Sequence, residues 1–121
     1  MKNAINWFEL PATNFERAKG FYSKVMGADL QKVEFGDVTM AFFPTENKGV
    51  GGCVIHGNGV APSAEGSLVY LNGGDDLAAP LSRVETAGGS VVQPKTDIGE
   101  NGFMAVFIDS EGNKVAFHSW N

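Results

Sequence analysis

The chain has 121 residues, 43% of them hydrophobic, which is enough for one core and predicts a single folding unit. Its formal net charge of −5, with nine Lys and Arg scattered along the chain, argues against nucleic acids and anionic membranes as partners. A lone cysteine, Cys53, excludes an internal disulfide, and the first residues lack the apolar run of a signal peptide or membrane span, so we expect a cytoplasmic protein.

A strand and a helix open the first half of the chain. Residues 5–10 are rich in aromatic and branched side chains and end at Pro11, which predicts a buried strand. Either Thr13 or Asn14 is suited to cap the following helix, and Thr13 with Glu16 has the spacing of a capping box. Gly27 predicts the end of the helix, because glycine accepts a left-handed backbone. The apolar residues of this helix recur at helical spacing: Phe15, Ala18, Tyr22, Val25 and Met26.

Three strands are predicted after this helix, over residues 29–35, 38–43 and 50–56, with turns at 36–37 and 44–49. The second half repeats the order. Residues 67–72 form a strand, Asp75 or Asp76 caps a helix that ends at Gly88 and Gly89, and strands follow at 91–92, 103–108 and 114–119. If Asp76 is the cap, Pro80 removes the first backbone hydrogen bond, so the helix is expected to begin later than the cap suggests.

The two halves align when the chain is shifted by roughly 61 positions. This shift places Leu10 on Leu71 and Gly27 on Gly88, and the linking segment is rich in Gly, Pro and small residues. We therefore predict an α+β fold of two tandem βαβββ modules. Module one spans residues 1–57, the connector 58–61 and module two 62–121.

Two local motifs resemble the vicinal oxygen chelate superfamily, which includes glyoxalase I, extradiol dioxygenases, methylmalonyl-CoA epimerase and the bleomycin and fosfomycin resistance proteins. The segment 15–22 followed by Val25-Met26-Gly27 resembles its first-helix signature, with an arginine, a Phe-Tyr pair and a glycine stop. The segment 109–113 resembles its late Asp-Pro-x-Gly-Asn turn, with Ser110 in place of proline. The chain is most similar to bacterial glyoxalase-related proteins. The resemblance implies curled sheets around a central pocket and a homodimer, in which a partner covers the open sheets.

The resemblance also implies four positions for the ligands of a divalent metal, one on the first and one on the last strand of each half. In this chain they correspond to Trp7 (or Asn6, if the alignment is shifted by one), Gly51 or Gly52, Ser67 and Ala116. None of these residue types forms a suitable ligand set, so we expect no metal cofactor. A bound divalent metal is the alternative.

Two histidines offer a different metal site. His56, His118 and Glu9 would form a two-histidine, one-carboxylate set if all three ligands were displaced from the usual positions. Otherwise both histidines bond to backbone or water at strand ends. His118 lies two residues beyond Ala116 and therefore faces the same side of its strand, where it either lines the pocket or is structural.

The remaining candidates are aromatic or acidic. Trp7 is either a pocket aromatic that stacks on a ligand or a core residue, and Glu9 is either a general base or an exposed carboxylate. We assign Trp7, Ser67, Ala116 and Phe103 to the pocket, and Glu9 and His118 as catalytic candidates. Residues 96–103 form either a mobile lid that pivots at two glycines or an ordinary turn. Cys53 lies in a strand without a nearby positive charge and is predicted to be buried and unreactive.

Two functions are compatible with these features. One is a glyoxalase-related protein that binds a small, apolar or aromatic molecule without metal. The other is a lyase or isomerase, similar to lactoylglutathione lyase, that acts on a small oxygenated metabolite through Glu9 and His118.

Overall fold

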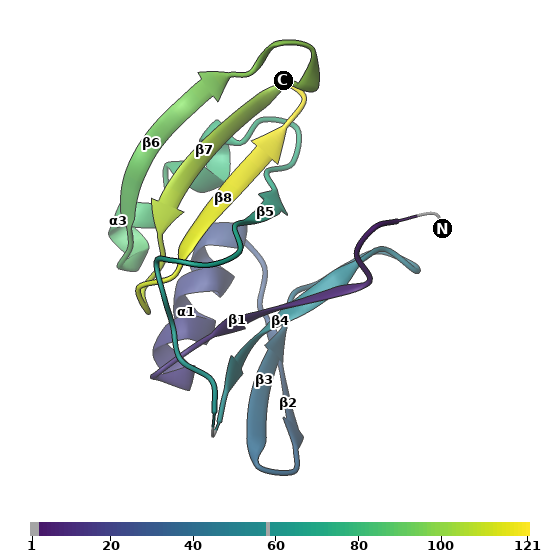
Figure 1. The fold of residues 1–121 in the computed structure, drawn as a ribbon, viewed down its shortest axis with the longest axis vertical. Coiled ribbons are helices and arrows are strands. Elements are labelled where there is room, and N and C mark those ends of the chain that lie inside the picture. The colour runs from purple at the N-terminus through teal and green to yellow at the C-terminus, as the bar shows by residue number, and fades with distance from the viewer. Residues whose placement is uncertain (1–2, 58) are drawn as a thin grey trace.

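The order of strand, helix and three strands occurs twice in the computed structural model, which describes residues 3–57 and 59–121 (Figure 1). Module one contains β1 (Trp7–Pro11), α1 (Phe15–Met26), β2 (Gln31–Phe35), β3 (Val38–Phe42) and β4 (Gly51–His56). Module two contains β5 (Val69–Asn72), α2 (Ala78–Leu81), α3 (Val84–Ala87), β6 (Ser90–Asp97), the 3-10 turn η1 (Gly99–Asn101), β7 (Phe103–Ile108) and β8 (Lys114–Ser119). Positions 1, 2 and 58, at the predicted starts of module one and of the connector, lie outside the described residues.

Each module forms one four-stranded sheet, with the orders β1-β4-β3-β2 and β5-β8-β7-β6. The first strand pairs in parallel with the last strand of its module, and the other pairs are antiparallel. A parallel pair requires a crossover connection, which the helix after the first strand provides. The predicted α+β fold of two tandem modules is therefore confirmed.

Helix α1 begins and ends with side-chain and backbone caps. Asn14 is the N-cap, and its Oδ1 accepts a hydrogen bond from the Arg17 N–H at 3.0 Å. Gly27 ends the helix in the left-handed conformation at φ 70°, as predicted. The predicted capping box of Thr13 and Glu16 is wrong, because Asn14 caps the helix while the Thr13 N–H donates to Glu111 Oε1 at 2.9 Å.

The second predicted helix is two separate turns, α2 and α3. Asp76 Oδ1 accepts a hydrogen bond from the Ala78 N–H at 2.9 Å, and helix α2 begins at Ala78. Pro80 has no N–H to donate, and the Arg83 N–H bonds to the Pro80 carbonyl three residues back, which tightens the backbone between the two turns. The sequence therefore predicts the position of this helical segment correctly, but the segment is two short helices and not one continuous helix.

Helix α1 lies between the two sheets, and its aromatic side chains reach both of them (Figure 1). Phe21 packs beside Phe107 of β7 with ring centroids 6.2 Å apart, and Tyr22 packs against Phe43 at 5.2 Å. A Cβ on Gly89 would lie only 2.8 Å from the Phe21 ring, so glycine is required where β6 approaches this helix. The two modules therefore share one core rather than two.

The turn between β7 and β8 connects module two to the start of α1. Glu111, whose side chain is only 1% exposed, accepts hydrogen bonds from the N–H groups of Thr13 and Asn14 and forms an ion pair with Arg17 at 2.7 Å. The buried Tyr22 hydroxyl donates to Asp109 Oδ2 at 2.7 Å. This turn, which resembles a family motif, thus joins the modules.

Candidate functional site

Strand alternation gives sheet one a face that points away from α1, which we call the module-one outer face. Leu10 of β1 and Val54 of β4 are buried against the helix. The residues next to them along each strand therefore point to the opposite side of the sheet. The register between β3 and β4 places the β3 residues Phe42 and Met40 on the same side. The module-one outer face consists of Trp7, Glu9, Met40, Phe42, Cys53 and Ile55.

Trp7 forms an aromatic platform on this face. Its ring comes within 3.4 Å of the position that a Cβ on Gly51 would take, and it meets Phe42 edge to face with centroids 5.1 Å apart. The side chain remains 43% exposed. Trp7 therefore lies over Gly51 of β4 and presents aromatic surface, rather than packing in the core.

Cys53 lies on the module-one outer face and is fully buried. Burial raises the pKa of its thiol to about 12, and the charge of Glu9 contributes in the same direction, while the Trp7 side chain acts in the opposite one. The thiol is therefore protonated at neutral pH and is no nucleophile. Glu9 itself is exposed on the same face.

The corresponding side of sheet two, the module-two outer face, consists of Tyr70, Met104, Val106, Ala116 and His118. Ala116 is fully buried and pairs with Tyr70, which is 51% exposed. Met104 pairs with His118. Phe103 points to the opposite side, where it packs against the core, so Met104 rather than Phe103 lies beside the candidate His118.

Both histidines are bonded to backbone carbonyls. His118 Nε2 lies 2.7 Å from the Asn101 carbonyl oxygen in η1, and its ring meets Trp120 edge to face at 4.7 Å. His56 Nδ1 lies 2.8 Å from the Ala12 carbonyl oxygen. His118 therefore ties the η1 turn to β8, in the segment that the sequence offered as a lid or an ordinary turn.

The internal symmetry of the structure tests the metal positions implied by the resemblance. Leu10 and Leu71 are equivalent buried residues, so the counterpart of Trp7 is Leu68 and not its neighbour Ser67. The counterpart of Ala116 on β4 is Cys53, because these two residues pair with equivalent positions of β1 and β5. Gly52 faces away, since a Cβ there would overlap the Phe8 ring.

This donor set does not fit a divalent cation. An indole N–H has no lone pair to offer, aliphatic side chains have none, and the thiol with a raised pKa is protonated. Within residues 3–57 and 59–121, no group of three His, Cys, Asp or Glu side chains is arranged to hold a metal, so the alternative set of Glu9, His56 and His118 is not assembled there.

A hollow of about 460 Å³ lies between the edges of β1 and β5. Its lining is mostly apolar, with Ile5 and Val50 from module one and Leu68 and Tyr70 from module two. Ser67 also lines it, and shares a second hollow of about 240 Å³ with Glu9 and Lys114. Sequence reasoning missed Phe42 and Tyr70, although both alternate with buried residues inside predicted strands.

Comparisons with known proteins agree with this geometry. Residues 4–117 match the model of the Glyoxalase/Bleomycin resistance protein/Dioxygenase superfamily. A glyoxalase/bleomycin resistance protein from Albidiferax ferrireducens is 17% identical, with a TM-score of 0.72 over 95% of this chain and 97% of that one. TnmS3, an antibiotic-binding protein from Streptomyces sp., is 21% identical, with a TM-score of 0.65 over 98% and 97%.

A glyoxalase I mutant from Zea mays is 23% identical, with a TM-score of 0.70 over 93% of this chain but only 44% of that one. The chain thus spans less than half the length of the maize enzyme. A search of curated proteins finds no match. No helix among the described residues is long and apolar enough to cross a membrane. Because the family model covers nearly all of its length, the chain belongs to the glyoxalase, bleomycin resistance protein and dioxygenase superfamily.

Proposed function

We propose that this chain binds a small, planar, apolar or aromatic molecule and does so without the metal used by enzymes of its superfamily. The observation that carries the proposal is the placement of Trp7 over Gly51, at a position where the resemblance implies a metal ligand. A half-exposed indole offers stacking surface and dispersion contact but no electron pair for a cation. The site is therefore suited to aromatic stacking.

The surroundings of Trp7 support the same ligand chemistry. Phe42 extends the aromatic surface, and the hollow between β1 and β5 adds aliphatic walls and the exposed ring of Tyr70. Ligand sites of this kind are mostly apolar with a few polar groups that orient the ligand. In this chain Ser67 and Asn72 line the hollow as polar groups, and Glu9 is exposed on the same face as Trp7. The fold shared with the antibiotic-binding TnmS3 is consistent with such a role.

A homodimer would complete the site. Both outer faces carry exposed aromatic residues, with Trp7 at 43% and Tyr70 at 51% exposure, and a single chain leaves both uncovered. Contact between the outer faces of two copies would bury these rings and enclose the ligand between them. The unpaired, unreactive Cys53 suits a reducing compartment, so we place the protein in the cytoplasm.

Tryptophan fluorescence tests the binding proposal. Neutral coumarin and a naphthalene sulfonate serve as planar probes, and Trp120→Phe removes the second indole while leaving Trp7 in place. We expect the probes to quench Trp7 emission in Trp120→Phe protein and to bind at least about tenfold more weakly to Trp7→Ala, the loss expected for one aromatic contact. Equal binding by Trp7→Ala and the unmodified protein would contradict the proposal.

A metal titration is the second test of the proposed metal-free site. Ni²⁺, Zn²⁺, Mn²⁺ or Fe²⁺ should leave the melting temperature unchanged, because binding to the folded state alone would raise it. A stoichiometric divalent metal in the purified protein, or a thermal shift that His118→Ala abolishes, would overturn the metal-free site.

The exposed carboxylate of Glu9 on the module-one outer face supports the second candidate, a lyase or isomerase similar to lactoylglutathione lyase. In that case Glu9 would remove a proton from the substrate, and His118 would either return a proton to it or orient the substrate. The enzyme reading predicts turnover of the methylglyoxal–glutathione adduct that is lost in Glu9→Gln. Absence of turnover in the unmodified protein, with or without added metal, would eliminate it.

A further inference from the structure

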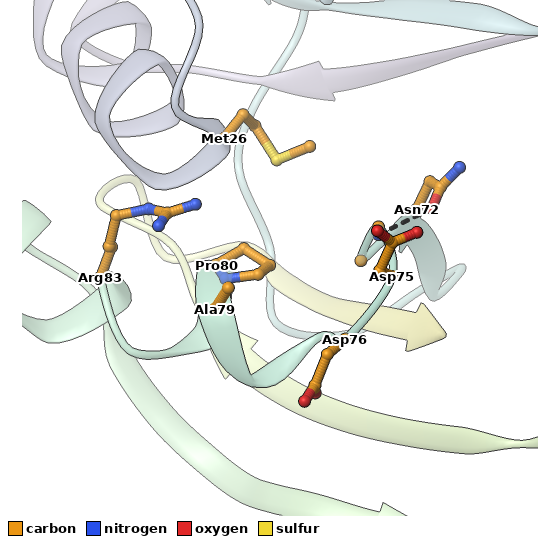
Figure 2. A pocket seen from close by; sticks show the side chains of 9 residues that line it. Met26, Asn72, Asp75, Asp76, Ala79, Pro80 and Arg83 are labelled. Carbon is orange, nitrogen blue, oxygen red and sulfur yellow. Dashed lines mark hydrogen bonds between the residues drawn. The ribbon is translucent and has the colours of Figure 1, made fainter. Parts of the chain in front are cut away.

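A further pocket of about 400 Å³ lies between the end of α1 and the loop that follows β5 (Figure 2). Its walls come from the end of α1, the end of β5, the loop between β5 and α2, helix α2 itself, and Arg83 just before α3. The lining residues that matter for its chemistry are Met26, Asp75, Asp76, Ala79, Pro80 and Arg83. Neither the metal positions nor the proposed ligand site uses any of its charged residues.

Arg83 supplies the positive side of this pocket. Its Nε donates to the Val25 carbonyl oxygen at 2.9 Å, which fixes the side chain under the last turn of α1. Among the described residues no acceptor engages the terminal guanidinium nitrogens, and Figure 2 shows them pointing into the pocket. A fixed guanidinium with free terminal N–H groups is suited to a bidentate bond with a carboxylate.

Asp75 supplies the negative side. Figure 2 shows its carboxylate across the pocket from Arg83, and the two side chains are too far apart to form an ion pair. Asp76 points away and bonds instead to Lys95 at 2.8 Å. The pocket therefore holds one uncompensated charge of each sign at opposite ends, with the apolar side chains of Met26 and Pro80 between them.

We infer that this pocket binds a small dipolar molecule, with a carboxylate held by Arg83, an ammonium group held by Asp75 and a short aliphatic segment between them. The separation of the two protein charges favours a molecule with its charged groups at its two ends, such as an ω-amino acid or a short peptide. A ligand with no net charge also avoids the repulsion that the net charge of −5 exerts on anions. This site adjoins the hollow between β1 and β5 at Asn72 but shares none of its charged residues with the proposed stacking site.

Calorimetric titration with ω-amino acids of increasing length tests the inference. 4-Aminobutanoate, 5-aminopentanoate and 6-aminohexanoate are the probes, and pentanoate and pentylamine are the singly charged controls. We expect one chain length to bind best, and Asp75→Asn to weaken it at least about tenfold, the loss expected for one charge-assisted hydrogen bond. Asp37→Asn, an exposed carboxylate in the turn between β2 and β3, should leave binding unchanged.

Two further variants separate binding from folding. Arg83→Gln removes the bond to α1 as well, so Ala79→Leu serves as a second variant that fills the pocket from an exposed position without touching its charges. Both should abolish binding, while Ala79→Leu should melt within a few degrees of the unmodified protein. Binding of no ω-amino acid, equal binding of pentanoate, or unchanged binding by Ala79→Leu would each overturn the inference. Quenching of Trp7 by planar probes should persist in Asp75→Asn, which distinguishes failure here from failure of the proposed function.

Discussion

The two modules share their order of strands and differ in their helices. Module one has a helix of 12 residues, whereas module two has two helices of four residues each. Side chains of α1 nevertheless contact sheet two as well as sheet one, as Phe21 does with Phe107 and Tyr22 with Phe43. The duplication is complete in topology but not in packing, because module two depends on a helix that belongs to module one.

Replacing Phe21 by Ala is the strongest test of this dependence. Phe21 is 2% exposed and contacts residues of both modules, so its loss should lower the free energy of unfolding by about 3–5 kcal/mol. Amide hydrogen exchange should become faster in β7 as well as in β3 and β4. Phe35→Ala, at a ring that is 73% exposed, should change stability by less than about 0.5 kcal/mol. Faster exchange in module one alone would show that the modules are separate.

Glu111 provides the second test, because it links module two to the first turn of α1. Replacing it by Ala should cost about 2 kcal/mol, because two backbone N–H groups and the Arg17 guanidinium lose their acceptor. Burial works to raise the pKa of Glu111, but hydrogen bonds from Arg17, Asn14 and Ser110, together with the Arg17 charge, outweigh it and hold the pKa below its ordinary value of 4.5.

This lowered pKa makes the link pH dependent. Because the folded pKa lies below the unfolded one, the stabilisation is complete above the unfolded value and disappears as the pH falls through the folded pKa. Urea denaturation at a series of acidic pH values should therefore show a shallower loss of stability in Glu111→Gln than in the unmodified protein. Glu34→Gln, at an exposed residue of β2, is the matched control. Parallel pH profiles for all three proteins would contradict the link.

The helix ends allow the finest comparison, since Gly27 and Gly88 occupy equivalent positions. Both have a left-handed backbone, at φ 70° and 113°, and a Cβ at either position would meet no close contact. Replacement by Ala should therefore cost about 1 kcal/mol in each module, from backbone strain alone. Gly20→Ala, within α1 and facing open space, should instead stabilise by about 0.5–1 kcal/mol. Thermal melts of the three variants check the signs, and a stabilised Gly88→Ala would show that the caps are not equivalent.

Much of the fold could be predicted because its signals are local. The alternation in the strands, the stripe of α1 and the stop at Gly27 each depend on neighbouring residues. Asn14 was one of the two predicted caps of α1, but the contact of Glu111 with the Thr13 N–H could not be predicted, because these residues lie 98 positions apart. Pro80 predicted a disturbed helix start but not a break between α2 and α3. The length of β6 was missed because its pairing register is irregular and the strand contains Pro94.

For the candidate site, the sequence predicts which side of its strand each residue faces. Trp7 and Ala116 lie on the faces that alternation assigns to them. The pairing of β1 with β4 decides whether Gly52 or Cys53 shares that face, and this register has no local sequence signal. The Asn101 carbonyl that binds His118 comes from a turn 17 residues away. The pocket of Arg83 and Asp75 likewise requires α1 and α3 to meet.

The turn that holds Glu111 against the start of α1 also affects how the protein folds during synthesis. Thr13 and Asn14 emerge from the ribosome long before Glu111, so their backbone N–H groups lack this acceptor until nearly the whole chain has been made. Such distant contacts slow folding, because a long loop must close before the contact forms. Module one is therefore not a finished intermediate on which module two is added. Module one reaches its native contacts only after the β7–β8 hairpin has been made, so the two modules complete their folding together.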